Sequence, residues 1–277
     1  MIGHEKLARD FKELSAKNNL ANCYLFFGQP RVGKKLFALC FANYLEIGGF
    51  HKPEKVLADF LLIKPDEKGT VGIDEIRKLK NFLWQKPAAS QRRTAVISDS
   101  EAMTGEAMNA ILKIAEEPPE SSLLIIIAND PERLPPTFQS RLQKIYFPPV
   151  PYAAIEKWLM EEIKCGAEQA KKFAEMSHGQ PGLALMAASD ENFESLLKDA
   201  EEFLKSGFWE RRNVIKFMLE NDNFDISRFL EAVLMVISKT ATGKNSELWH
   251  KVSALRRDSE SYNINPRLQL ESLLGGV

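Results

Sequence analysis

Hydrophobic residues in the first half of the chain fall into short continuous runs that alternate with amphipathic segments. Five runs predict buried strands, at residues 24–27, 60–63, 94–97, 123–128 and 143–147. Between them, apolar residues recur every three or four positions, which is the spacing of a helix with one buried face. These helices are expected over residues 5–18, 34–45, 73–83 and 105–116. Apolar strands that alternate with helices are typical of a parallel sheet covered on both faces, so the predicted fold class is α/β.

The strand pattern stops at Pro148-Pro149-Val150-Pro151. Beyond this point the apolar spacing is helical, with a break at Gly179-Gln180-Pro181-Gly182. Further helices are expected near residues 191–206, 209–220, 226–242, 245–257 and 265–274. We therefore predict three domains: an α/β domain over residues 1–150, a small helical domain over 151–188 and an all-helical domain over 189–277.

The composition is that of an ordinary globular protein, with 44% hydrophobic and 27% charged residues. The net charge of -1 lacks the basic excess of a free-standing nucleic-acid binder. DNA contact would then need a local patch, such as the basic residues between Lys78 and Arg93, or an assembly; a solvated face is the alternative for that stretch. The three cysteines are odd in number and widely spaced, so we expect no disulfide framework, and the absence of a CxxC pair argues against a zinc site. No apolar run approaches a membrane span of about 18 residues, and the N-terminus does not resemble a signal peptide, so we expect a cytoplasmic protein.

One motif carries candidate chemistry. Gly28-Gln29-Pro30-Arg31-Val32-Gly33-Lys34 fits GxxxxGK and lies between a predicted strand and a predicted helix, which predicts a phosphate-binding P-loop. Gly28 and Gly33 would let backbone N–H groups surround phosphate oxygens, and Lys34 would neutralise their charge. The next residue should be Ser or Thr, whose hydroxyl binds Mg²⁺, but it is Lys35, a cation. The loop is therefore degenerate: it either holds ATP or ADP without hydrolysis or is vestigial.

The end of the third strand is the second place to look for a metal ligand. P-loop ATPases place an Asp there for Mg²⁺, often followed by a Glu that activates water. The segment that follows, Asn109 to Pro119 (NAILKIAEEPP), resembles the NALLKxLEEPP helix of the clamp-loader subunits of bacterial DNA polymerase III, which are AAA+ proteins. In this register Ser98 stands at the position of the family's Asp and Asp99 at that of its Glu. With Lys35, the resemblance implies a subunit that does not turn over ATP by itself.

A second segment of the same family contains an arginine. Residues 134–142 (LPPTFQSRL) resemble the "SRC" segment of clamp loaders, with Leu142 in place of Cys. The family's Arg reaches across a subunit interface to a neighbour's γ-phosphate, so the resemblance implies that Arg141, next to Ser140, is an arginine finger that acts in trans. The alternative is a surface Arg at the end of a strand. Asn129 stands at a polar sensor position, where it would either sense a γ-phosphate or cap a turn.

The resemblance covers most of the chain and extends to the second sensor region. Pro181-Gly182 stands where ATP-hydrolysing members carry an Arg, as in delta-prime-like subunits. The resemblance implies a RecA-like AAA+ domain, a helical lid and a helical collar in a pentameric ring. It implies an ATPase-inactive component of the polymerase holoenzyme at the nucleoid-associated replisome, without a membrane partner. Its implied partners are the gamma/tau ATPase subunits, a delta subunit, the sliding clamp and, through the assembly, primer–template DNA.

The resemblance also implies that no cofactor is required. Zinc is not expected, because residues 46–58 lack the cysteines that most relatives carry there. Two alternatives remain open. One is an autonomous AAA+ ATPase of DNA replication or repair. The other is a scaffold that neither binds nucleotide nor supplies a finger.

Overall fold

The structure, a computed structural model, describes residues 2–190, 192–219, 225–239, 248 and 251–255. The chain divides into two compact units. The α/β unit comprises residues 1–158 and 179–182, and the helical unit comprises residues 159–178 and those from 183 onward. This division does not separate a lid from a collar, so the three-domain organisation stays a prediction.

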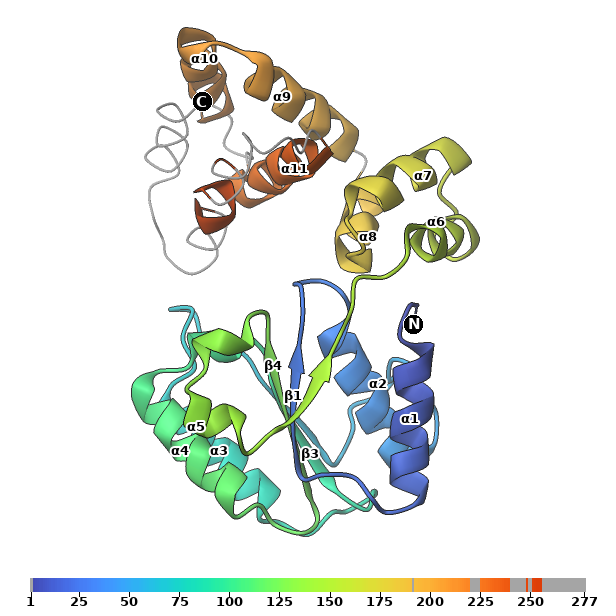
Figure 1. Ribbon diagram of the computed structural model, residues 1–277, viewed down its shortest axis with the longest axis vertical. Helices are drawn as coiled ribbons and strands as arrows, with labels where there is room; N and C mark the ends of the chain where they lie inside the picture. Colours follow the sequence, from blue (N-terminus) through green and yellow to red (C-terminus); the bar gives the residue numbers. More distant parts are fainter. Residues whose placement is uncertain (1, 191, 220–224, 240–247, 249–250, 256–277) are drawn as a thin grey trace. The chain divides into compact units, whose positions relative to one another are not determined.

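A single parallel sheet forms the centre of the α/β unit (Figure 1). Its strands are β1 (Cys23–Phe27), β2 (Phe60–Ile63), β3 (Arg93–Ile97), β4 (Ser122–Ala128) and β5 (Gln143–Tyr146). They lie in the order β2-β3-β4-β1-β5, and every neighbouring pair is parallel. All seven residues of β4 are buried, as the position of this strand inside the sheet requires. The structure therefore confirms the predicted α/β class.

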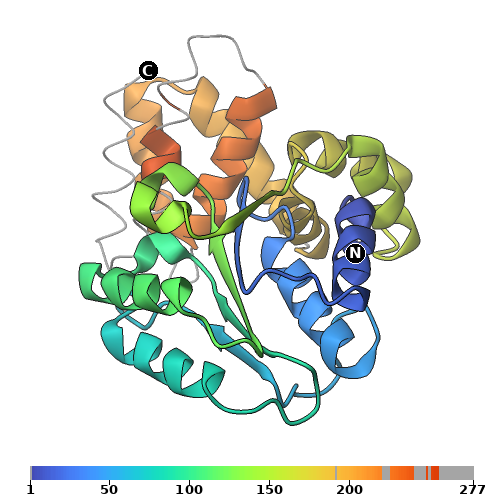
Figure 2. The same ribbon diagram turned by 60° about the horizontal axis from the view of Figure 1, so that its bottom comes forward.

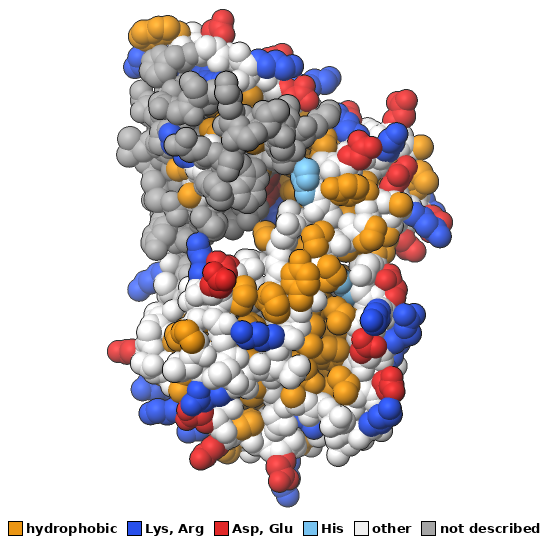
Figure 3. Space-filling view, viewed as in Figure 1, with side chains coloured by type: hydrophobic (Ala, Val, Ile, Leu, Met, Phe, Trp, Pro, Cys, Tyr) orange, Lys and Arg blue, Asp and Glu red, His pale blue; other side chains and the backbone are white. Residues whose placement is uncertain are grey.

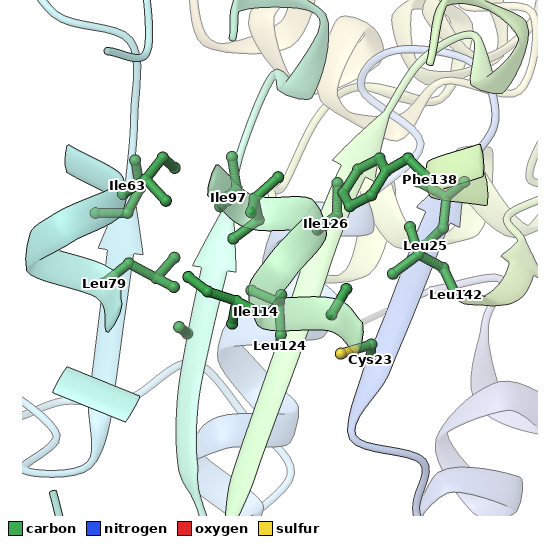
Figure 4. Packing of buried hydrophobic residues seen from close by; sticks show 14 of the residues in the cluster. Cys23, Leu25, Ile63, Leu79, Ile97, Ile114, Leu124, Ile126, Phe138 and Leu142 are labelled. Carbon is green, nitrogen blue, oxygen red and sulfur yellow. The ribbon is translucent and has the colours of Figure 1, made fainter. Parts of the chain in front are cut away.

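Helices cover both faces of this sheet, as Figure 2 shows after a rotation. The helices α1 (Glu5–Ala16) and α2 (Lys34–Ile47) lie on one face, and α3 (Ile73–Leu83) and α4 (Gly105–Glu116) lie on the other. A hydrophobic core lies on each face of the sheet, and alternate strand residues point into one core or the other. Within β1, Leu25 packs toward α3 and α4, whereas Phe26 packs toward α1 and α2. Figure 4 shows the core on the side of α3 and α4, in which Ile114 of α4 lies over side chains of several strands.

Three short elements are not predicted by the hydrophobic periodicity. They are η1 (Ser100–Ala102), η2 (Pro131–Arg133) and α5 (Pro136–Gln139). Each is one turn long or less, too short to display a helical repeat. The first follows β3 and the other two follow β4, so all three lie near the carboxyl edge of the sheet, where the candidate site is built.

The helical unit contains the remaining helices. They are α6 (Tyr152–Glu161), α7 (Ala167–Met176), α8 (Pro181–Ser189), α9 (Phe193–Lys205), α10 (Phe208–Leu219) and α11 (Ile226–Lys239). The first residues of α6 and α8 belong to the α/β unit. The rings of Phe203 and Phe229 join α9 to α11 with centroids 5.5 Å apart. The Arg211 guanidinium donates to the carbonyls of Phe203 and Leu204 and so caps the end of α9.

The predicted helix at 265–274 lies outside the described residues, and of the one at 245–257 only residue 248 and residues 251–255 are described, all helical. Within the described part of the chain, no helix is both long enough and apolar enough to cross a membrane.

Candidate nucleotide pocket and surface arginine

The glycine loop connects the end of β1 to the start of α2. Gly28 has φ of +139° and Gly33 has φ of +109°, in the region that residues with a Cβ rarely adopt. The two glycines nevertheless serve different purposes. A Cβ at Gly28 would collide with the carbonyl oxygen of Phe147, just beyond β5, whereas a Cβ at Gly33 would meet nothing closer than the His4 ring, at 3.8 Å. Gly28 thus permits close backbone packing, and Gly33 mainly permits the turn into α2.

The side chain of Lys34 is buried, and its ammonium is engaged by the protein itself. Its Nζ donates to the carbonyl oxygens of Gly28 at 2.6 Å and Gln29 at 2.7 Å, and to Oδ1 of Asn129 at 3.0 Å. An ammonium has three protons, so these three acceptors use all of them. Burial lowers the pKa of Lys34 to about 8, although two nearby carboxylates act in the opposite direction. The Lys34 ammonium therefore forms hydrogen bonds with the backbone of its own loop.

The two positions where a magnesium ligand is expected do not fit the ion. Lys35 is exposed, and its pKa is lowered by desolvation and by the nearby cation of Lys64. Ser98 is 3% exposed, and its hydroxyl donates to the carbonyl of Ile63 on the neighbouring strand, at 3.2 Å. Mg²⁺ needs oxygen ligands, and an ammonium supplies none. The hydroxyl of Ser98 is engaged inside the sheet.

Carboxylates follow Ser98 directly. Asp99 is exposed and has φ of +55°, where it begins η1. Glu101 was not singled out from the sequence, yet its Oε1 accepts hydrogen bonds from the backbone N–H groups of Asn129 at 2.6 Å and Asp130 at 3.0 Å. This carboxylate fixes the end of β4 to the segment that follows β3. The only sequence signal for it was an acidic residue shortly after a strand, which is too common to be specific.

Asn129 is brought to the P-loop by the sheet. Its amide oxygen accepts a hydrogen bond from Lys34, while the following turn is capped by Asp130, whose Oδ1 accepts from the Glu132 N–H at 3.0 Å. In this geometry Asn129 contacts the P-loop lysine, and its neighbour caps the turn. The two sites that the sequence placed 95 residues apart thus form one cluster.

Two other segments of the α/β unit hold the loop. The Gly182 N–H donates to the carbonyl of Arg31 at 3.0 Å, and a Cβ at Gly182 would lie 3.1 Å from Cβ of Arg31. From the N-terminal side, Nε2 of His4 lies 2.8 Å from the carbonyl oxygen of Val32. The segment Pro181-Gly182 therefore packs closely, through its backbone, on the P-loop.

Arg141 lies in a separate group of contacts, between α4 and α5. Its Nη2 is 2.6 Å from Oε1 of Glu116, and its Nη1 donates to the carbonyl of Thr137. Ser140 Oγ donates to the same carbonyl at 3.0 Å. Leu142 is buried in the core shown in Figure 4, which anchors the chain directly after the exposed arginine.

Two residues of the basic stretch, Arg92 and Arg93, contact other parts of the protein. Arg92 lies 3.3 Å from the Asn22 side-chain oxygen and is half-buried. The Arg93 guanidinium stacks 4.7 Å above the Phe82 ring and also donates to the Lys86 carbonyl. On the face of the α/β unit drawn in Figure 3, basic and acidic side chains are interspersed around hydrophobic ones. The contacts of Arg92 and Arg93 within the protein favour structural roles for these two residues over contacts with DNA phosphates.

The parallel sheet, the glycine loop between β1 and α2, and the polar residues at the ends of β3 and β4 define an AAA+ P-loop domain followed by helices. The chain belongs to the family described as DNA polymerase III, delta subunit, whose model matches residues 3–151.

Relatives of known name agree with this assignment. The chain is 28% identical to DNA polymerase III subunit delta' of Escherichia coli K12 over 190 residues, covering 67% of this chain and 55% of that protein. It is 28% identical to the Bacillus subtilis delta' subunit over 194 residues, covering 66% and 58%. The matched part thus spans little more than half the length of these relatives. A gamma subunit-related protein from Thermotoga maritima superposes with a TM-score of 0.59 at 22% identity, over 95% of this chain and 97% of that one, which shows the shared fold.

Proposed function

We propose that this chain is an ATPase-inactive subunit of a clamp loader of DNA polymerase III, and that it supplies Arg141 to the ATP site of a neighbouring subunit. Membership of the family and the names of its relatives, which are subunits of that polymerase, support this role. Its neighbours would be gamma/tau ATPase subunits and a delta subunit. The assembly would act on a sliding clamp and on primer–template DNA.

The observation that carries the proposal is the chemistry of the two cation-ligand positions. Lys35 offers a positive charge, and the buried Ser98 hydroxyl donates into the sheet. Phosphoryl transfer in P-loop proteins depends on a metal ion that bridges the phosphates and neutralises the developing charge. Without that ion, a nucleotide in the P-loop would remain unhydrolysed.

Arg141 is suited to act outside its own subunit. Its side chain is 35% exposed, and its contacts come from α4 and α5. A guanidinium stays charged at all relevant pH values, and its planar fork matches phosphate oxygens. Supplied in trans, such a group accelerates phosphoryl transfer by about 10³–10⁵.

Steady-state ATP hydrolysis by the purified chain is the first test. We expect no turnover above a protein-free control, either for the natural chain or for Lys34→Ala. Turnover that disappears in Lys34→Ala would instead support an autonomous ATPase and contradict the proposal.

Reconstitution of the loader with gamma/tau, delta, clamp and primed DNA is the second test. Arg141→Ala should reduce hydrolysis at the site it serves by about 10³-fold or more, so total loader ATPase should fall by at least the share of that site. Arg133→Ala is the matched control, because Arg133 is another exposed arginine of the same unit, on η2, and should leave hydrolysis unchanged. Unchanged hydrolysis in Arg141→Ala would leave only a scaffold role.

A further inference from the structure

Arg141 and Glu116 form an ion pair between two segments of the α/β unit. Glu116 is the last residue of α4, and Arg141 follows the end of α5. The Nη2–Oε1 distance is 2.6 Å, and the side chains are 35% and 40% exposed. A second contact, from Nη1 to the Thr137 carbonyl, holds the other arm of the guanidinium. Each terminal nitrogen of the guanidinium is therefore held by one contact.

The placement of Glu116 strengthens its attraction for a cation. The carboxyl end of a helix carries negative partial charge, because its last carbonyl groups lack intrahelical partners. The twelve-residue helix α4 ends at Glu116, so this partial charge and the carboxylate act on Arg141 together. An arginine held in this way samples fewer rotamers than one on a free surface loop.

The two contacts leave part of the guanidinium available. Arginine has five N–H donors, and the contacts with Glu116 and Thr137 use one on each terminal nitrogen. The Nε–H and one proton on each Nη remain to donate to phosphate oxygens. The side chain can thus be oriented and still bind an anion, and orientation before the reaction removes part of the entropy cost of reaching the transition state.

We propose that Glu116 is a positioning residue for Arg141, which orients the guanidinium toward the ATP site of the neighbouring subunit. This inference rests on the proposed role of Arg141 as a finger in trans. Glu116 does not touch the nucleotide in this scheme, and it acts only through the arginine.

Glu117 provides a matched control. It is the adjacent residue, it is exposed, and it carries the same charge. Among the described residues, the carboxylate that pairs with Arg141 is that of Glu116 and not that of Glu117. A difference between substitutions at the two positions therefore reports on the ion pair rather than on net charge. The conservative variant Glu116→Asp keeps the carboxylate and should restore part of any loss.

The test measures kcat and KM for ATP in the loader reconstituted with gamma/tau, delta, clamp and primed DNA. Glu116→Gln should lower kcat at the site served by Arg141 by about threefold to tenfold, in keeping with the modest strength of partly exposed ion pairs. KM should stay unchanged, because the finger acts mainly in the transition state. Glu116→Asp should fall between Glu116→Gln and the natural chain, and Glu117→Gln should match the natural chain.

A second comparison separates failure of this inference from failure of the proposed function. In an Arg141→Ala background, Glu116→Gln should have no further effect, because the group that it positions is absent. An equal loss in both backgrounds, or a kcat in Glu116→Gln at or above that of the natural chain, would overturn the positioning role while leaving Arg141 as the finger. If Arg141→Ala alone leaves kcat unchanged, the proposed function itself fails, and the inference falls with it.

Discussion

The Nζ of Lys34 lies 3.0 Å from Oδ1 of Asn129, and this hydrogen bond joins the P-loop to the end of β4. It completes the three partners of the ammonium, because the carbonyl oxygens of Gly28 and Gln29 take the other two protons. In a P-loop this lysine normally binds phosphate, but here all three of its ammonium protons are donated to protein acceptors. These three hydrogen bonds hold Lys34 between its own loop and the end of β4.

The first prediction concerns the pKa of the buried Lys34 side chain. We expect the ammonium to titrate at about pH 8 in the folded chain, because burial disfavours its charged form. Glu101→Gln should lower that pKa further, because it removes the carboxylate that contributes most to retaining the proton. NMR of the lysine side chain as a function of pH would measure both values. A midpoint at the ordinary 10.5 would contradict the buried position.

The lowered pKa of Lys34 also makes the free energy of unfolding depend on pH. The folded pKa lies below the unfolded value, so the unfolded chain binds more protons between about pH 8 and 10.5. Over that range Lys34 should make the free energy of unfolding rise with pH. Lys34→Met should remove this contribution.

The two P-loop glycines should respond differently to alanine. Gly33→Ala should cost about 1–3 kcal/mol, the usual cost of a non-glycine residue in a rare backbone region. Gly28→Ala should cost more than about 3 kcal/mol, because the same strain is joined by a collision with the Phe147 carbonyl oxygen. Urea denaturation of both variants measures the difference. Equal losses would show that the packing of the loop against the segment after β5 is looser than the structure indicates.

The sequence was sufficient to predict all five strands and the helices α1 to α4, because each has a continuous apolar run or a clear helical spacing. The glycine loop was identifiable because its chemistry is local. The contacts of Lys34 with Asn129 and of Glu101 with the end of β4 were not predictable. They depend on β3, β4 and β1 being neighbours in the sheet, and an apolar run does not specify its neighbours.

Asp59 provides a third prediction; it directly precedes β2, at the amino end of that strand. Its carboxylate is 2% exposed and accepts hydrogen bonds from the backbone N–H groups of Ala88, Ala89 and Ser90. Burial raises the pKa of Asp59, but the hydrogen bonds together outweigh it, so the pKa lies below the usual 3.8. Asp59→Asn should lower the free energy of unfolding by about 2–3 kcal/mol at neutral pH, because hydrogen bonds to a charged group are lost.

The effect of Asp59 should depend on pH. Because the folded pKa is depressed, the contribution of the carboxylate is complete above pH 3.8 and is lost as the pH falls through the folded pKa. The difference between the natural chain and Asp59→Asn in urea denaturation should therefore shrink in acid. Asp74→Asn is the control, since Asp74 is exposed and its carboxylate pairs with Arg77 of the same helix. A difference that is constant across this range would contradict the buried, hydrogen-bonded carboxylate.

His4 provides the last prediction. His4 is 2% exposed, its Nε2 donates to the Val32 carbonyl, and the buried Nδ1 has no hydrogen-bond partner among the residues that the structure describes. Protonation would place a buried charge on a ring whose second N–H finds no acceptor. Desolvation accordingly lowers the pKa of His4, against weaker opposing effects from the Val32 carbonyl and Glu5.

Because the folded pKa of His4 lies below the unfolded value of 6.5, its contribution to stability is complete above pH 6.5 and is lost as the pH falls toward the folded pKa. The natural chain should therefore lose stability between pH 7.5 and pH 5, as measured by urea denaturation. Burial also lowers the pKa of His178, so part of this loss should persist in His4→Gln, which retains a side-chain donor for Val32. His51→Gln is the control, because His51 is exposed. Equal losses in the natural chain and in His4→Gln would mean that the N-terminal segment does not hold the P-loop through a neutral, buried imidazole.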